Sequence, residues 1–138
     1  MTLKIFLDTN VWLRYFVKND RDQYEAAFNL VSMAEGGLIR VYTSSVVLME
    51  INHVARRIYQ IPKDQVIIWF KAIQKIRNIT IVEKTDFVLA LSFYQKYNIK
   101  LADCIIASQL PKSTVLVSFD EELSKIKDIS VKKPQEIK

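Results

Sequence analysis

Four acidic residues stand at positions from which their side chains could act together on one substrate. Asp8 directly follows a short apolar run, and Asp120 lies just after a second such run. Asp103 falls in the first turn of a helical segment, and Glu50 lies beside the apolar stripe of another. Carboxylate oxygens are the ligands that Mg²⁺ and Mn²⁺ prefer, and an ion held in this way can activate water against a phosphate. These residue types therefore predict metal-assisted chemistry on a phosphate ester.

Each of these acids also has an interpretation that involves no catalysis. Asp8 could begin a turn and Asp120 could cap a helix, because aspartate accepts backbone N–H bonds at both kinds of position. Asp103 could be an acid that a helix dipole favours, and Glu50 could be a solvated helix residue. Carboxylates that converge repel one another and raise each other's pKa, and a divalent cation removes that cost. Because all four acids occupy such positions in one chain, we favour the metal hypothesis.

Histidine and cysteine chemistry is limited by how few of these residues there are. The chain has one cysteine, Cys104, and one histidine, His53. A single cysteine excludes an intramolecular disulfide and a multi-cysteine metal site, and a single histidine excludes a two-histidine zinc motif. Cys104 lies among apolar residues, which predicts a buried and inert thiol.

Length and composition predict one domain over residues 1–138. Half of the 138 residues are hydrophobic and the formal net charge is +5, a basic balance that favours anionic partners such as nucleic acid. No apolar run exceeds five residues, far fewer than a membrane span needs, and the N-terminus shows no signal-peptide cleavage pattern. We therefore expect a protein of the cytoplasm that does not enter a membrane.

Strand-like and helix-like segments alternate along the chain. Segments that alternate in this way favour parallel strand pairing, so we expect a three-layer α/β/α sandwich around a mostly parallel sheet of four or five strands. In such sheets, ligands bind beyond the carboxyl ends of the strands. The lysine-rich tail from Ser130 is expected to fray after the last strand. The predicted strands are 3–7, 38–42, 78–82, 114–117 and 129–131. The predicted helices are 20–35, one capped by Ser44 or Ser45, one opened by Pro62, one starting at Thr85 or Asp86, 101–110 and a short turn at 120–126.

Apolar residues at helical spacing predict which helix faces pack against the sheet. Aromatic side chains such as Trp12, Trp69 and Phe93 are expected in the core or at an interface. The helix that starts at Thr85 or Asp86 carries its apolar residues at Val88, Leu89, Leu91, Phe93 and Tyr94.

Four segments, taken in order, resemble the PIN-domain family, and in particular the small VapC-type toxins of toxin–antitoxin pairs. The first is Phe6-Leu7-Asp8-Thr9-Asn10-Val11, a strand followed by an acid. Ser44 to Glu50, Leu101 to Ala107 and Leu116 to Leu123 look like the segments that carry the other three acids. The resemblance covers nearly the whole chain.

The resemblance implies a Mg²⁺- or Mn²⁺-dependent ribonuclease. It maps the metal-binding and catalytic acids onto Asp8, Glu50, Asp103 and Asp120, and supporting polar positions onto Asn10 and Ser118. It also implies an RNA substrate, a VapB-type antitoxin whose C-terminal segment covers the active site, and a homodimer. The chain departs from the family pattern at Thr43-Ser44-Ser45-Val46, where relatives often carry a proline, and Glu121 or Glu122 could share the role of Asp120.

Four basic residues are hypothetical contacts for RNA phosphates: Arg14, Lys18, Arg56 and Arg57. A solvated surface explains them equally well.

Three other function classes fit parts of the sequence pattern. A phosphatase with Asp8 as nucleophile usually needs a second acid two residues later, where this chain has Asn10. A receiver domain would need an acidic pair near the first strand, which is absent. A non-catalytic RNA- or protein-binding domain of the same fold stays open, and it would have no need of metal.

Overall fold

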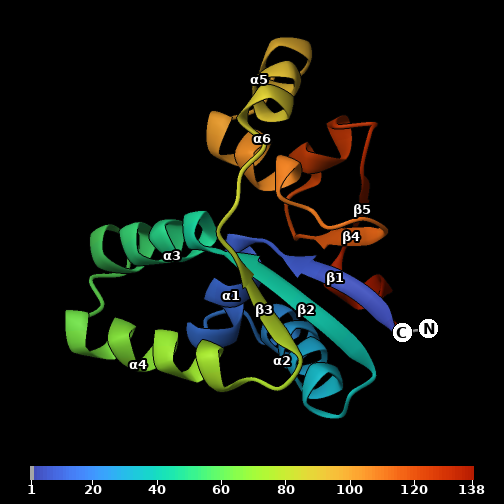
Figure 1. Ribbon diagram of the computed structural model, residues 1–138. Coiled ribbons are helices and arrows are strands. Elements are labelled where there is room, and N and C mark those ends of the chain that lie inside the picture. Colours follow the sequence, from blue (N-terminus) through green and yellow to red (C-terminus); the bar gives the residue numbers. More distant parts are fainter. Residues whose placement is uncertain (1) are drawn as a thin grey trace.

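The first strand of the chain, β1 (Leu3–Leu7), lies at the centre of a five-stranded sheet of order β3-β2-β1-β4-β5 (Figure 1). The structure is a computed structural model that describes residues 2–138. The other strands are β2 (Ile39–Ser44), β3 (Ile79–Val82), β4 (Thr114–Val117) and β5 (Ser130–Lys132). All neighbouring strands pair in parallel, so their carboxyl ends meet at one edge. The α/β/α sandwich with a parallel sheet is confirmed.

Helices lie on both sides of this sheet, with α1 and α2 on one side and α6 on the other, while α5 packs against α6 (Figure 1). α3 packs against α1, α4 and the start of α6. Two short 3₁₀ helices follow β4 and β5 and are named η1 and η2. The helices are α1 (Thr9–Phe16), α2 (Arg21–Glu35), α3 (Ser45–Arg57), α4 (Lys63–Lys75), α5 (Phe87–Lys96), α6 (Leu101–Ser108), η1 (Glu121–Lys125) and η2 (Pro134–Glu136).

Polar side chains begin several of the helices where the sequence predicts. The Ser44 hydroxyl accepts the Val47 N–H at the start of α3, which selects Ser44 over Ser45 as the cap. The carboxylate of Asp86 does the same for α5 by accepting the Leu89 N–H. Pro62 stands directly before α4. Because such caps satisfy N–H groups that a helix leaves unpaired, they fix where each chain segment turns away from the sheet edge.

Two segments differ from the prediction at the ends of the chain. α1 was not predicted, because its β-branched and aromatic residues have modest helix propensity; burial of Val11 and Trp12 in the core stabilises it instead. The strand predicted at 129–131 is present as β5. The expected fraying after this strand is wrong, because η2 forms there and Pro134 and Ile137 are buried against the rest of the molecule.

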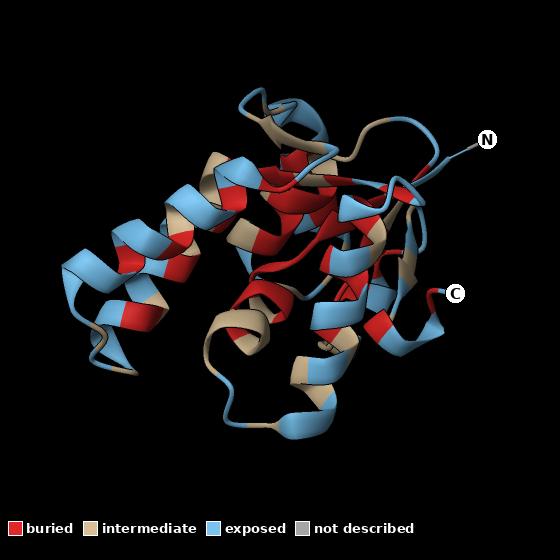
Figure 2. Ribbon diagram, turned by 90° about the horizontal axis from the view of Figure 1, so that it is seen from below, coloured by how far each residue is buried: buried red, intermediate tan, exposed pale blue. Residues whose placement is uncertain are grey.

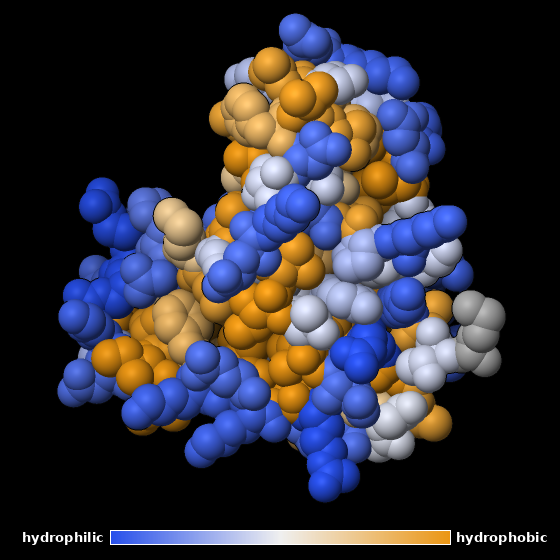
Figure 3. Space-filling view, in the orientation of Figure 1, coloured by the Kyte–Doolittle hydropathy of each residue, from blue (hydrophilic) through white to orange (hydrophobic). Residues whose placement is uncertain are grey.

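The core lies between the central strands and the helix faces turned toward them (Figure 2). Trp12, Trp69 and Phe93 are buried there as expected, and so is Cys104. In α5, Ala90 and Phe93 are the buried residues. Its large apolar side chains gather on the surface instead (Figure 3). Among the described residues 2–138, no helix is both long and apolar enough to cross a membrane.

Candidate active site

Three carboxylates meet at the carboxyl edge of the sheet. Asp8, Glu50 and Asp103 each place one oxygen atom within 4.8 Å of the other two. Asp8 follows β1 and caps α1, Glu50 lies in the middle of α3, and Asp103 lies in the first turn of α6. Parallel pairing sends β1 and β2 to the same edge, where Asp8 follows β1 and α3, which follows β2, carries Glu50. Asp103 reaches this edge from the start of α6, the helix before β4. We call this group the acidic triad.

Asp8 is the most firmly held member of the acidic triad. Its Oδ1 accepts the Thr9 N–H at 2.8 Å. Its Oδ2 accepts the Ser118 hydroxyl at 2.8 Å and the Asn10 side-chain amide at 3.4 Å. Burial nevertheless raises the pKa of Asp8 from 3.8 to about 7, against the lowering effect of the Ser118 hydrogen bond. The charged form of Asp8 is thus energetically unfavourable without a nearby cation.

Thr9 connects the first acid to the second. Its hydroxyl donates to Glu50 Oε1 at 2.9 Å, while its own N–H donates to Asp8. Thr9 is 8% exposed, so solvent competes little for either bond. Sequence analysis missed this residue. The signal that could have found it is its place between Asp8 and Asn10, in the turn that starts α1.

Asp103 is held in place by its helix, and other acids surround it. Only 9% of Asp103 is exposed, and its pKa is raised from 3.8 to about 6. Burial is the largest cause of this rise, the charges of Glu50 and Asp120 contribute to it, and Lys100 opposes it. A buried, mutually repelling set of hard oxygen donors fits a Mg²⁺ or Mn²⁺ ion, whose charge offsets the repulsion. The acidic triad is therefore chemically suited to hold one.

The two predicted supporting residues lie where they can fix the acids. The Asn10 amide donates to Ser118 Oγ at 2.9 Å, and Asn10 Oδ1 accepts the Phe119 N–H at 3.1 Å. Ser118 Oγ also accepts the Asp120 N–H at 2.9 Å. A polar network thus ties the end of β1 to the end of β4, where the Asp8 N–H also donates to the Val117 carbonyl.

Asp120 stands beside the acidic triad and not within it. Its Oδ1 accepts the Glu122 N–H at 2.9 Å, so it caps η1, as its structural interpretation allowed. Its charge still reaches Asp103, whose pKa it raises. The carboxylate of Glu121 accepts a hydrogen bond from Lys133 and that of Glu122 accepts one from Lys125. Glu122 also lines a cavity together with Asp103 and Asp120.

The four basic residues considered for RNA lie outside the acidic triad. Arg14 donates to Asn19 Oδ1 at 2.8 Å, and the Lys18 ammonium lies 5.1 Å from the centre of the Tyr24 ring. Arg56 and Arg57 are exposed in the last turn of α3. Their role with RNA stays a prediction. Lys100, at the start of α6, is the basic residue whose charge acts on Asp103, and sequence analysis missed it.

Comparison with known proteins agrees with this geometry. Residues 5–129 match the sequence model of the PIN domain. The chain belongs to the PIN-domain family. No curated protein sequence matches it.

Solved structures share this PIN fold along nearly the whole chain. VapBC2 from Rickettsia felis, bound to a DNA fragment from its promoter, gives a TM-score of 0.70 at 19% identity, over 95% of this chain and 98% of that one. VapBC-1 from nontypeable Haemophilus influenzae gives 0.68 at 18%, over 96% and 99%. VapC20 from Mycobacterium tuberculosis, a toxin that cleaves the sarcin-ricin loop, gives 0.63 at 17%, over 88% and 94%. At these identities the likeness shows the fold.

Proposed function

We propose that this PIN domain is a metal-dependent endoribonuclease of the cytoplasm and the toxin of a type II toxin–antitoxin pair. The observation that carries the proposal is the acidic triad, which gathers Asp8, Glu50 and Asp103 at the edge where ligands bind to parallel sheets. Nucleases of this chemistry need hard oxygen donors around a cation and a basic surface for the substrate. The net charge of +5 supports an anionic substrate.

The residues of the site have distinct roles in this proposal. Asp8, Glu50 and Asp103 hold the ion, which when bound lowers the pKa of a water and stabilises charge on the scissile phosphate. Thr9 and Ser118 donate to Glu50 and Asp8 and so fix the directions of their oxygens. Asp120, next to Asp103, holds a second ion or the attacking water.

The partners in this proposal are a VapB-type antitoxin and a second copy of the chain. The similar structures from R. felis and H. influenzae are VapBC assemblies, which supports a partner of the antitoxin type. The exposed apolar side chains of α5, among them Phe87, Val88 and Leu91, support a protein contact there, since such faces are often buried in assemblies. We propose that this contact forms a homodimer.

Metal-dependent cleavage of RNA tests the proposal directly. The purified chain is incubated with total RNA in Mg²⁺, in Mn²⁺ and in EDTA, next to the Asp8→Asn variant. We expect fragments with either ion, and none in EDTA or with the variant. Cleavage that continues in EDTA would contradict the metal centre. A folded protein that leaves RNA intact with both ions would contradict the nuclease and favour a binding domain of the same fold.

A further inference from the structure

A cavity opens beside the acidic triad at the start of α6. Its volume is about 440 Å³, and Asp103 and Asp120 form part of its wall. The remaining wall comes from the end of α5 and the short connection to α6, through Tyr94, Asn98, Ile99 and Lys100. The cavity therefore continues the site away from the acids, toward residues that the proposed chemistry has not used.

The lining away from the acids is flat and apolar with one amide. Tyr94 is 49% exposed, so its ring can accept a stacked partner, and the partly buried Ile99 adds apolar surface beside it. The exposed amide of Asn98 offers one hydrogen-bond acceptor and two donors. An aromatic ring next to an amide is the combination that proteins use to bind an unpaired nucleobase.

The charges around the cavity favour a neutral ring over a free anion. Asp103 and Asp120 would repel an anion placed between them, whereas a nucleobase carries no charge there. The Glu122 carboxylate also reaches this wall but is paired with Lys125. Lys100, at the rim, is the group suited to the phosphate attached to such a base.

We propose that this cavity binds an unpaired nucleobase of the RNA, adjacent to the phosphate that the acidic triad receives. The proposal rests on the ribonuclease function and adds a base-binding subsite formed by Tyr94 and Asn98. In a duplex, each base is stacked and paired and cannot enter a side pocket unless it is flipped out of the helix. The base pocket would therefore select for unpaired segments.

Abasic scanning tests this inference. Single-stranded RNA oligonucleotides that each lack one base near the cleaved bond are compared as substrates in Mn²⁺. The enzymes are the unaltered protein, Tyr94→Ala, Tyr94→Trp and the control Phe28→Ala, which changes an exposed ring of α2 outside the cavity. Binding of the same RNAs is measured by fluorescence anisotropy in the Asp8→Asn background, and the oligomeric state of each variant is checked by light scattering.

Loss of one particular base should raise KM for the unaltered protein by on the order of 10- to 100-fold, the range of base stacking on an aromatic side chain. The same loss should cost Tyr94→Ala almost nothing further, while Tyr94→Trp and Phe28→Ala should respond like the unaltered protein. A fully paired RNA should be cleaved poorly by all of them.

Two results would overturn the base pocket while the ribonuclease stands. One is that the protein cleaves RNA, but the removal of a base raises KM equally for the unaltered protein and for Tyr94→Ala at every abasic position. The other is equal cleavage of paired and unpaired RNA. A protein that neither binds nor cleaves RNA gives a third result, in which the proposed function itself fails and the pocket with it.

Discussion

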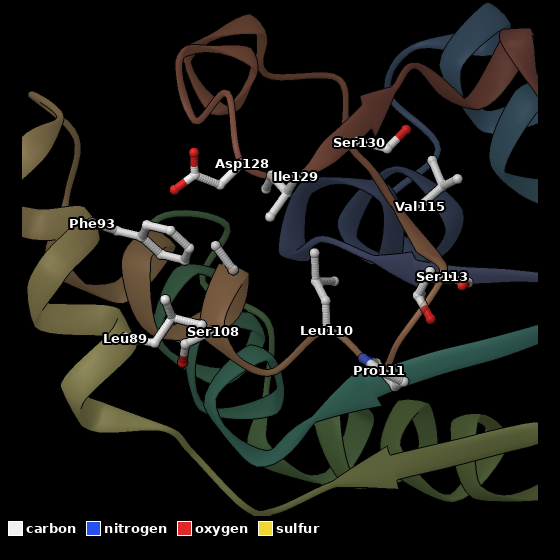
Figure 4. A pocket seen from close by; sticks show the side chains of 12 residues that line it. Leu89, Phe93, Ser108, Leu110, Pro111, Ser113, Val115, Asp128, Ile129 and Ser130 are labelled. Carbon is white, nitrogen blue, oxygen red and sulfur yellow. The ribbon is translucent and has the colours of Figure 1, made fainter.

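Each end of α6 borders a cavity, and the two cavities differ in the residues that lie beside them. At its C-terminal end lies the larger one, of about 610 Å³, beside the amino ends of β4 and β5 (Figure 4). Side chains such as Leu89, Phe93, Leu110 and Ile129 make its wall largely apolar (Figure 4). The N-terminal end has the smaller cavity together with the acidic triad. The comparison teaches that size alone does not locate the chemistry; the carboxyl edge of the parallel strands does.

The largest contrast should come from substitutions at the two ends of α6. Asp103→Asn should lower the cleavage rate by more than about 100-fold, since loss of even an outer partner of a metal site costs 10- to 100-fold. Ser108→Ala removes a hydroxyl that donates to the Ile105 carbonyl at the other end, and it should leave the rate unchanged. Both rates are measured on one RNA substrate in Mn²⁺. If both variants lose the same share of the cleavage rate, the two ends of α6 do not differ in function.

A smaller loss is expected when the link between the acids is cut. Thr9→Val keeps the shape of the side chain but removes the hydroxyl that donates to Glu50. Affinity for Mn²⁺, measured by calorimetry without substrate, should fall by about 10-fold, a typical effect of an outer partner. Thr9→Ser retains the hydroxyl and should restore the affinity. If the valine variant binds Mn²⁺ as tightly as the serine variant does, the Thr9 hydrogen bond has no role in orienting Glu50.

The parts of the site that the sequence predicts are those that follow strands directly. Asp8 and Ser118 stand next to apolar runs whose strand character is evident, so their place at the sheet edge follows from parallel pairing alone. Asp103 was also expected there, from its place in the first turn of a helix. The role of Tyr94 could not be foreseen, because it depends on how α5 packs on α6, a contact that no local pattern specifies.

Features of two helices could not be predicted from the sequence, for the same physical reason. α1 forms although its residues favour helix only modestly, because Trp12 gains more from burial than the backbone loses. The apolar residues of α5 did not indicate which of them would be buried, and Val88 is 82% exposed. In both cases the decision lies in tertiary contacts, which periodicity along one segment does not contain.

In EDTA, the free energy of unfolding should fall with rising pH because two buried acids of the acidic triad, Asp8 and Asp103, become charged. Burial raises the pKa of Asp103 from 3.8 to about 6 and that of Asp8 to about 7. An acid whose folded-state pKa is raised costs nothing below its unfolded pKa, and its full penalty is present above the folded value. The free energy of unfolding should therefore decline between about pH 4 and pH 7.

Asp103→Asn should remove the Asp103 share of this decline, on the order of 2 kcal/mol at pH 7.5. Thermal unfolding at pH 4.5 and 7.5 provides the measurement, with Ser108→Ala as the control. Mn²⁺ should raise the midpoint of the unaltered protein more than that of the variant, since an ion that binds only the native state stabilises it. If stability changes with pH equally in Asp103→Asn and in the unaltered protein, burial of the charged Asp103 carboxylate does not destabilise the fold.

The smallest effect is expected beside the apolar cavity. Ser113 has a φ of 60°, a left-handed conformation that L residues other than glycine, asparagine and aspartate seldom adopt. Ser113→Gly should raise the free energy of unfolding by about 0.5 kcal/mol, because relief of this strain exceeds the added freedom of the unfolded chain. Ser113→Ala retains the Cβ atom and should give no gain. Chemical denaturation measures both, and a change of RNA cleavage in either variant would show that the two ends of α6 are coupled.

The central place of β1 also has a consequence for biosynthesis. The strand made first pairs on one side with β4, and Asp8 meets Ser118 across 110 residues of sequence. During translation, Asp8 and Glu50 are made before Asp103 and Ser118 exist. The nascent polypeptide therefore lacks a complete acidic triad until α6 has been made. Under the proposed function, the chain cannot cleave RNA before that point.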